Sequence, residues 1–100
     1  MDNKIEKLIQ EKNLNAERIT PEHIEGTIIK EEYFKLTDVL TVCVLTLGNN
    51  FTVTGESACA SPENYNKEIG EKIARDKAKE KIWLLEGYLL KQRLHENNQG

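Results

Sequence analysis

The sequence has few of the residues that build metal centres or disulfide frameworks. Its 100 residues include two cysteines, Cys43 and Cys59, and two histidines, His23 and His95. Neither cysteine belongs to a CxxC pair and the histidines are far apart, so we expect no metal ion and no cofactor. With no export signal visible at the N-terminus, we expect two reduced thiols rather than a disulfide.

Long apolar runs are also lacking, and none approaches the roughly 20 residues that cross a bilayer. We therefore expect no membrane contact and a place in the cytoplasm. The net charge is −3, with 14 basic and 17 acidic residues mixed along the chain. This balance argues against binding nucleic acid through bulk charge. The length predicts a single small domain over residues 1–96, followed by a disordered polar tail at residues 97–100.

Helical periodicity is strongest in the last third of the chain. Ser61 is a candidate N-cap and Pro62 suits the first helical position, so a long helix is predicted to begin there. Two shorter helices are predicted near the N-terminus, one over residues 2–13 and one that begins at Thr20 and Pro21. One stripe of the long helix begins with small residues and ends with large ones: Gly70, Ala74, Ala78, Ile82, Leu85 and Leu89.

The middle of the chain has strand patterns. An edge strand is predicted over residues 30–36, a strand covered on both faces over 39–47, and an alternating strand from Phe51 to Thr54. Gly48, Asn49 and Asn50 accept the positive φ angles of a tight turn. The predicted class is α+β: a three-stranded antiparallel meander covered by the C-terminal helix, with one or two short N-terminal helices.

The segment from Thr54 to Pro62 is predicted to be a loop of small residues that opens onto the long helix. Small side chains let a ligand approach the backbone, and a helix N-terminus favours negative charge. Arg75 and Lys79 share a helix face one turn apart and can add positive charge. The same loop can equally be a tight connection with no ligand. The candidate ligand-binding residues are Thr54, Gly55, Glu56, Ser57, Ala58, Ser61, Arg75 and Lys79.

No catalytic constellation is visible in the sequence. Neither GxxxxGK[ST] nor GxGxxG occurs, so the two common nucleotide fingerprints are missing. Cys59 lies near the predicted helix start, where a thiolate is stabilised, but no neighbouring base is evident. We expect a protein that is not an enzyme, with chemistry at Cys59 or Glu56 kept as an alternative.

Three segments of the chain resemble a known phage family. The segments that carry the similarity are LTVCVLTL, NNFTVTGESACASPENYNKEIGEKIARDKAKEKIW and LEGYLL. The similarity is to the phage gene-49/gene-66 proteins and spans roughly residues 18–94. Members usually have Asn-Gly where this chain has Asn49-Asn50, and often proline where it has Leu84. The resemblance implies a phage or prophage origin and a place in the infected bacterial cell. It implies no reaction and no catalytic residues.

Three functional hypotheses are compatible with these features. The preferred one is a counter-defence accessory protein that binds and sequesters a small nucleotide-derived immune signal of the cyclic nucleotide type, by analogy with other small phage proteins. The second is a protein–protein inhibitor of a host enzyme. The third is a small enzyme that uses Cys59. A helix of about 30 residues is longer than strands of about six, so we expect a homodimer or a higher oligomer.

Overall fold

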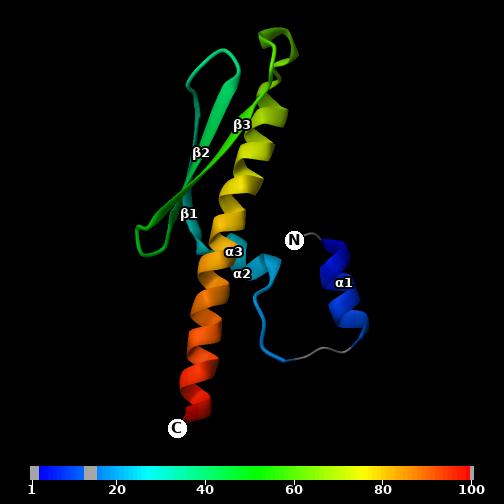
Figure 1. Ribbon diagram of the computed structural model, residues 1–100, viewed down its shortest axis with the longest axis vertical. Coiled ribbons are helices and arrows are strands. Elements are labelled where there is room, and N and C mark those ends of the chain that lie inside the picture. Colours follow the sequence, from blue (N-terminus) through cyan, green and yellow to red (C-terminus); the bar gives the residue numbers. More distant parts are fainter. Residues whose placement is uncertain (1–2, 13–15, 100) are drawn as a thin grey trace.

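The chain folds as an antiparallel sheet with one long helix packed along it (Figure 1). The computed structural model describes residues 3–12 and 16–99. Its α+β class, the three-stranded meander and the long C-terminal helix are as the sequence predicted. The elements in chain order are α1 (Asn3–Glu11), α2 (Pro21–Thr27), β1 (Ile28–Lys35), β2 (Leu40–Leu47), β3 (Thr52–Ala58), a short 3₁₀ helix η1 (Pro62–Asn64) and α3 (Lys67–Gln99).

Helix α2 begins where its local signals predict. The Thr20 hydroxyl accepts a hydrogen bond from the His23 backbone N–H at 3.1 Å, and Pro21 occupies the first turn. A capping hydroxyl satisfies one of the amides that a helix start leaves without a partner. The helix is seven residues long and passes directly into β1 at Ile28. The start of this helix is therefore encoded locally.

The sheet order is β1-β2-β3, with both pairs antiparallel. Tyr33 of β1 lies opposite Cys43 of β2, and Cys43 lies opposite Gly55 of β3. The turn between β2 and β3 places Asn50 at φ 71°, in the left-handed region. Asparagine tolerates this region better than most residues, so the hairpin turn forms without a glycine at this position.

Helix α3 covers one face of the sheet. Side chains on β2 alternate between buried and half-buried along the strand. The prediction that both faces of this strand are covered is therefore wrong, because only the face under α3 is fully buried. The buried apolar core consists of Ile24, Cys43, Leu45, Leu47, Val53, Ala74, Ala78 and Ile82.

The bounds of α3 differ from those expected. The helix begins at Lys67 rather than Ser61, and it extends to Gln99. Residues 97–99, predicted to lie in a disordered tail, belong to the helix, and residue 100 lies outside the described residues. Across the described residues, no helix combines the length and apolarity needed to span a bilayer.

Candidate functional site

The predicted small-residue loop is largely a strand. β3 continues to Ala58, with Thr54 opposite Val44 and Glu56 opposite Val42. The loop prediction for Thr54 to Ala58 is therefore wrong. Glycine, serine and alanine have weak strand preference, and here pairing with β2 overrides that preference. The role proposed for these residues in ligand binding stays a prediction.

Gly55 is small because α3 crosses directly over it. A Cβ atom at Gly55 would lie 2.1 Å from the Ala74 carbonyl oxygen and 2.3 Å from the Ala78 backbone nitrogen. Ala74 and Ala78 are themselves fully buried. Close packing of strand and helix thus accounts for the small residue at position 55 without a ligand.

The true start of α3 is one turn beyond the predicted one. Ser61 precedes the short 3₁₀ helix η1, and its side chain makes no capping hydrogen bond. Asn66 caps α3 instead, since its Oδ1 accepts a hydrogen bond from the Ile69 N–H at 2.9 Å. The Asn66 carbonyl accepts a second one from the Gly70 N–H, also at 2.9 Å. The prediction of Ser61 as the α3 N-cap is wrong.

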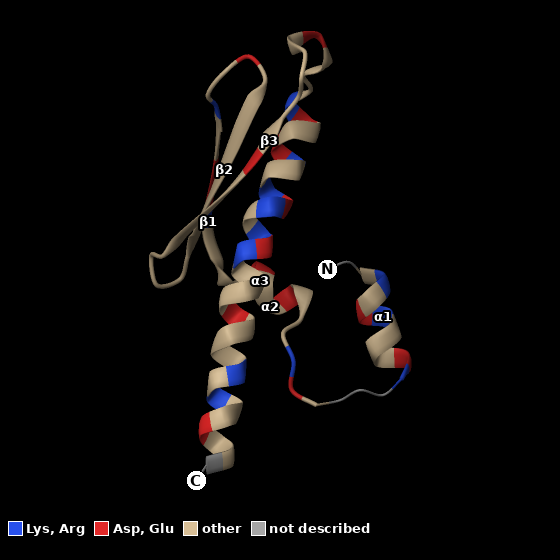
Figure 2. Cartoon of the chain, viewed as in Figure 1, with Lys and Arg blue, Asp and Glu red and all other residues tan. Residues whose placement is uncertain are grey.

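Arg75 and Lys79 lie beside acidic side chains of α2 and β1. The Arg75 guanidinium donates to both carboxylate oxygens of Glu25, at 2.8 and 3.2 Å, and through Nε to Glu31 at 2.6 Å. Lys79 Nζ donates to Glu25 at 3.0 Å. Arg75 is eight residues into α3, about 12 Å along the axis from its start. The two cations therefore tie α3 to α2 and β1, and they are not gathered at the helix N-terminus. Figure 2 shows basic and acidic residues interspersed on this part of α3.

This ion-pair cluster has a pH signature. The Glu25 pKa is lowered from 4.5 to about 2, chiefly by its hydrogen bonds from Arg75. Burial opposes this shift in part, and the hydrogen bond and charge of Lys79 add to it. A carboxyl with a depressed folded-state pKa stabilises the fold above pH 4.5, and that contribution is lost as the pH falls toward 2. We expect Glu25→Gln to be less stable than the native chain at pH 7. The gap should be at most about 1 kcal/mol, because the carboxylate is 47% exposed and solvent screens it.

Urea unfolding at pH 7 and at pH 2 measures this effect. The difference in free energy of unfolding between the native chain and Glu25→Gln should shrink at pH 2, where the Glu25 carboxyl is protonated in the unfolded chain and about half protonated in the folded chain. Glu63→Gln, on the exposed 3₁₀ helix, serves as the matched control for the loss of one negative charge. An equal gap at both pH values contradicts the proposed role of the Glu25 charge.

Other predicted site residues border a separate open hollow. Thr54, Gly55 and Glu56 line a space of about 400 Å³ together with Lys77 and Lys81 of α3, beside Glu80 and Leu84. Lys81 Nζ lies 3.5 Å from the Thr54 hydroxyl. The basic residues here are partly offset by the two acidic ones. The structure thus brings Thr54, Gly55 and Glu56 together, but away from Ser57, Ser61 and Arg75.

A small polar pocket lies where the end of β3 meets the start of α3. Its volume is about 120 Å³, below the roughly 300–1,000 Å³ of typical small-molecule sites. Ser57 and Ala58, both predicted site residues, line it. We call this site the polar pocket; its lining comprises Val39, Thr41, Ser57, Ala58, Cys59, Asn64, Tyr65, Asn66, Ile69, Gly70 and Ile73.

Thr41 is the most informative residue in the polar pocket. It is 2% exposed, and its Oγ1 is buried without a hydrogen-bond partner among the described residues. Gly70 leaves space above it, because a Cβ there would lie 3.1 Å from this oxygen. A buried hydroxyl without a partner costs about 1–3 kcal/mol, so an additional group bound in the pocket would relieve this cost.

An aromatic ring lines the same pocket, and a cation lies over that ring. Lys35 Nζ lies 4.1 Å from the centre of the Tyr65 ring, within the range of a cation–π contact. Asn64 and Asn66 contribute side-chain amides. Hydroxyl and amide side chains and one aromatic ring therefore line the polar pocket.

The two cysteines differ in their surroundings. Cys43 is fully buried, and burial raises the pKa of its thiol, so it is protonated at neutral pH. Cys59 is half-buried at the polar pocket, with Sγ 4.0 Å from the Val39 carbonyl oxygen. Both are free thiols, as expected. Among the described residues, no group of three His, Cys, Asp or Glu side chains is placed to hold a metal ion.

Several pocket residues escaped the sequence reasoning. Thr41 lies within an apolar run, where a threonine is an ordinary strand residue, and only its burial reveals the hydroxyl. Asn64 and Asn66 did carry a signal, since asparagine is a strong helix cap. The neighbouring Ser61-Pro62 pair, however, offered an earlier start that fitted equally well.

Fold and site together define a small α+β meander-and-helix domain with a polar pocket at the sheet–helix junction. The chain belongs to the Phage protein (N4 Gp49/phage Sf6 gene 66) family, whose model matches residues 19–94. The family resemblance predicted from the sequence is thereby confirmed, and α1 lies outside the matched region. No curated protein and no solved structure is significantly similar to this chain.

Proposed function

We propose that this phage protein is a counter-defence accessory protein that sequesters a small nucleotide-derived immune signal in the cytoplasm of the infected bacterium. It binds the signal without chemistry and acts as a homo-oligomer. The observation that carries the proposal is the buried Thr41 hydroxyl, which has no hydrogen-bond partner in the described part of the chain and belongs to a residue lining a polar pocket beside the start of α3.

The size of the polar pocket limits what enters it. About 120 Å³ admits a phosphate-sized group and excludes a whole nucleotide. In the proposed complex a phosphate accepts hydrogen bonds from Thr41, Ser57 and Asn64, while the helix N-terminus favours its charge. The rest of the ligand extends outward over Tyr65, where Lys35 adds positive charge.

Sequestration requires affinity and stoichiometry rather than catalysis. A phage protein that holds a signal molecule lowers its free concentration in proportion to the number of sites present. Several sites in one oligomer would add to this capacity. The extended α3, which exposes Tyr88 and Leu89 at 70% and 59%, supports association between copies.

Calorimetry with cyclic dinucleotides, cyclic trinucleotides and cyclic ADP-ribose isomers tests the proposal. We expect at least one of them to bind at micromolar concentration or tighter. Thr41→Val should weaken that binding tenfold or more, since a hydrogen bond to a charged group contributes about 1.5–3 kcal/mol. Thermal unfolding of the free variant should be unchanged or shifted upward, because an unpaired buried hydroxyl has been removed.

Thr52→Val is the matched control, an exposed β3 threonine outside the pocket, and should bind like the native chain. Two results would end the proposal. One is the absence of binding across the whole panel at micromolar concentration. The other is native affinity in Thr41→Val, which would place any ligand elsewhere on the molecule.

A further inference from the structure

The buried stripe of α3 continues beyond the sheet. Ala74, Ala78 and Ile82 are fully buried, and the same spacing then reaches Leu85 and Leu89, which are 38% and 59% exposed. A helix of 33 residues is about 50 Å long, whereas a strand of eight spans about 27 Å. The last third of α3 therefore presents to solvent the face that its first part buries.

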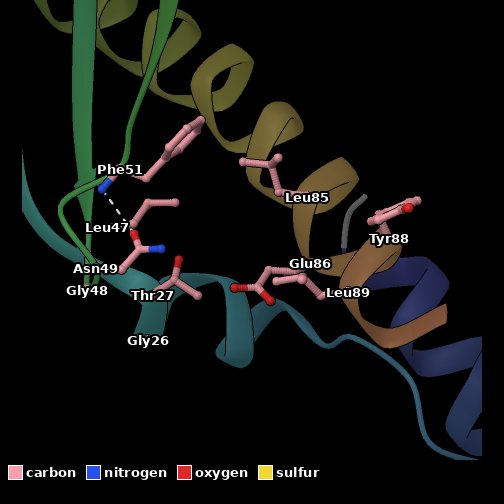
Figure 3. Close-up of a pocket in the computed structure, with 10 residues that line it drawn as sticks. All are labelled: Gly26, Thr27, Leu47, Gly48, Asn49, Phe51, Leu85, Glu86, Tyr88 and Leu89. Carbon is pink, nitrogen blue, oxygen red and sulfur yellow. Dashed lines mark hydrogen bonds between the residues drawn. The ribbon is translucent and has the colours of Figure 1, made fainter. Parts of the chain in front are cut away.

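A groove lies beside this exposed face, between the end of α2, the β2–β3 turn and α3 (Figure 3). We call it the hairpin groove; it has a volume of about 450 Å³. Phe51, 53% exposed, points from the turn toward Leu85 of α3. The groove is open at Gly26 and Gly48, since a Cβ atom placed on either glycine would have no other atom within 4 Å. It is an open apolar site of the size of a short helix face.

Helix α1 exposes a matching apolar stripe. Ile5, Leu8 and Ile9 recur at helical spacing, Ile5 and Leu8 are 45% and 51% exposed, and no described α1 residue is buried. The space between α1 and α3 is a hollow of about 610 Å³; Ile5 and Trp83 line it together with four charged side chains of α3, Lys72, Asp76, Lys79 and Glu80. An amphipathic helix usually buries its apolar face against another apolar surface.

A chain cannot easily fill its own hairpin groove with its own α1. In Figure 1 the β2–β3 turn and α1 lie on opposite sides of α3. The segment that leads from α1 to α2 is held there by ion pairs between Arg18 and Glu6 and between Arg93 and Glu17. Five residues, 12–16, separate the end of α1 from Glu17, and five residues span at most about 18 Å.

We propose that the hairpin groove of one copy binds the apolar stripe of α1 from a second copy. In a two-fold dimer the exchange is reciprocal, so each contact occurs twice. Both surfaces present apolar side chains, Ile5 and Leu8 on the α1 stripe and Leu85 and Leu89 in the groove. The groove lies within the family-matched region and α1 outside it, so α1 adds an interface to the shared domain.

This inference rests on the homo-oligomer in the proposed function and names its interface. Oxidative crosslinking of a Leu8→Cys, Leu89→Cys double variant of the full chain tests it. We expect a covalent dimer, absent from each single variant. The matched control pairs Leu8→Cys with Leu84→Cys, a more exposed leucine outside the groove, and should give little dimer. A crosslinked monomer, equal dimer in the control, or no crosslink would overturn the proposal.

Sedimentation equilibrium of Leu8→Glu gives a second readout. We expect the dimer dissociation constant to rise at least tenfold, with the helical circular dichroism and thermal transition of the domain retained. Leu84→Glu should associate like the native chain. A dimer that tolerates Leu8→Glu contradicts the α1 exchange. Calorimetry with the nucleotide panel on the native chain reports on the polar pocket at the other end of α3. A failure of ligand binding is therefore distinguished from a failure of the dimer interface.

Discussion

Gly55→Ala is expected to lower the free energy of unfolding by at least about 3 kcal/mol, the upper end for overpacking of a core. The added methyl would lie 2.1 Å from the Ala74 carbonyl oxygen and 2.3 Å from the Ala78 nitrogen. Both are backbone atoms of α3, so no side chain can rotate away and the helix must lift off the sheet. Urea unfolding followed by circular dichroism measures the loss.

Gly87→Ala is the matched control for this substitution. Gly87 also lies on α3, but a Cβ there meets nothing within 4 Å. Alanine in a helix interior is favoured over glycine, so this variant should gain about 0.5–1 kcal/mol. Opposite signs at the two positions are the expected result. A native-like stability for Gly55→Ala would show that strand and helix are not packed as closely as described.

Ile82→Ala is expected to lower the free energy of unfolding by about 2–5 kcal/mol, the range measured for large core side chains cut to alanine. Ile82 is fully buried and is among the largest such side chains in the core. Its loss leaves a cavity between α3 and the sheet, where Leu45 and Val53 are also buried. Chemical denaturation gives the value directly.

Leu84→Ala provides the comparison on the same helix. Leu84 is 76% exposed, and exposed positions usually change stability by less than about 0.5 kcal/mol. If the two variants lose similar amounts, the assignment of the buried face of α3 would be wrong. If only Ile82→Ala is destabilised, the small-to-large stripe identified in the sequence is the core face.

The elements that sequence reasoning placed well are those with local signals. Thr20 and Pro21 carry a complete helix start within four residues, and the structure uses it. Asn50 takes the positive φ that the turn needs, next to strands whose apolar pattern fixes their pairing. The spacing of Ala74, Ala78 and Ile82 identified the buried face of α3. In each case the determining residues are close together in the chain.

The features that were missed depend on contacts between distant residues. Gly55, Ser57 and Ala58 favour a loop when taken alone, and they form a strand because β2 lies alongside and α3 requires a small residue below it. Arg75 was expected to serve a ligand, but Glu25 lies 50 residues away and is placed beside it only by the fold. The buried Thr41 hydroxyl likewise has no hydrogen-bond partner among the described residues, and a local sequence pattern does not reveal this.

The order of the strands has a consequence for how the molecule reaches this shape. Each strand pairs with the one next to it in the chain, and α3 follows β3 after a short connection. Few long chain closures are then required before stabilising contacts form, which is the topology associated with rapid folding. The longest closure brings α3 onto the segment before α2, where the ion pair between Glu17 and Arg93 joins residues 76 positions apart. The assembly of this corner is therefore the step for which the chain must close its longest loop.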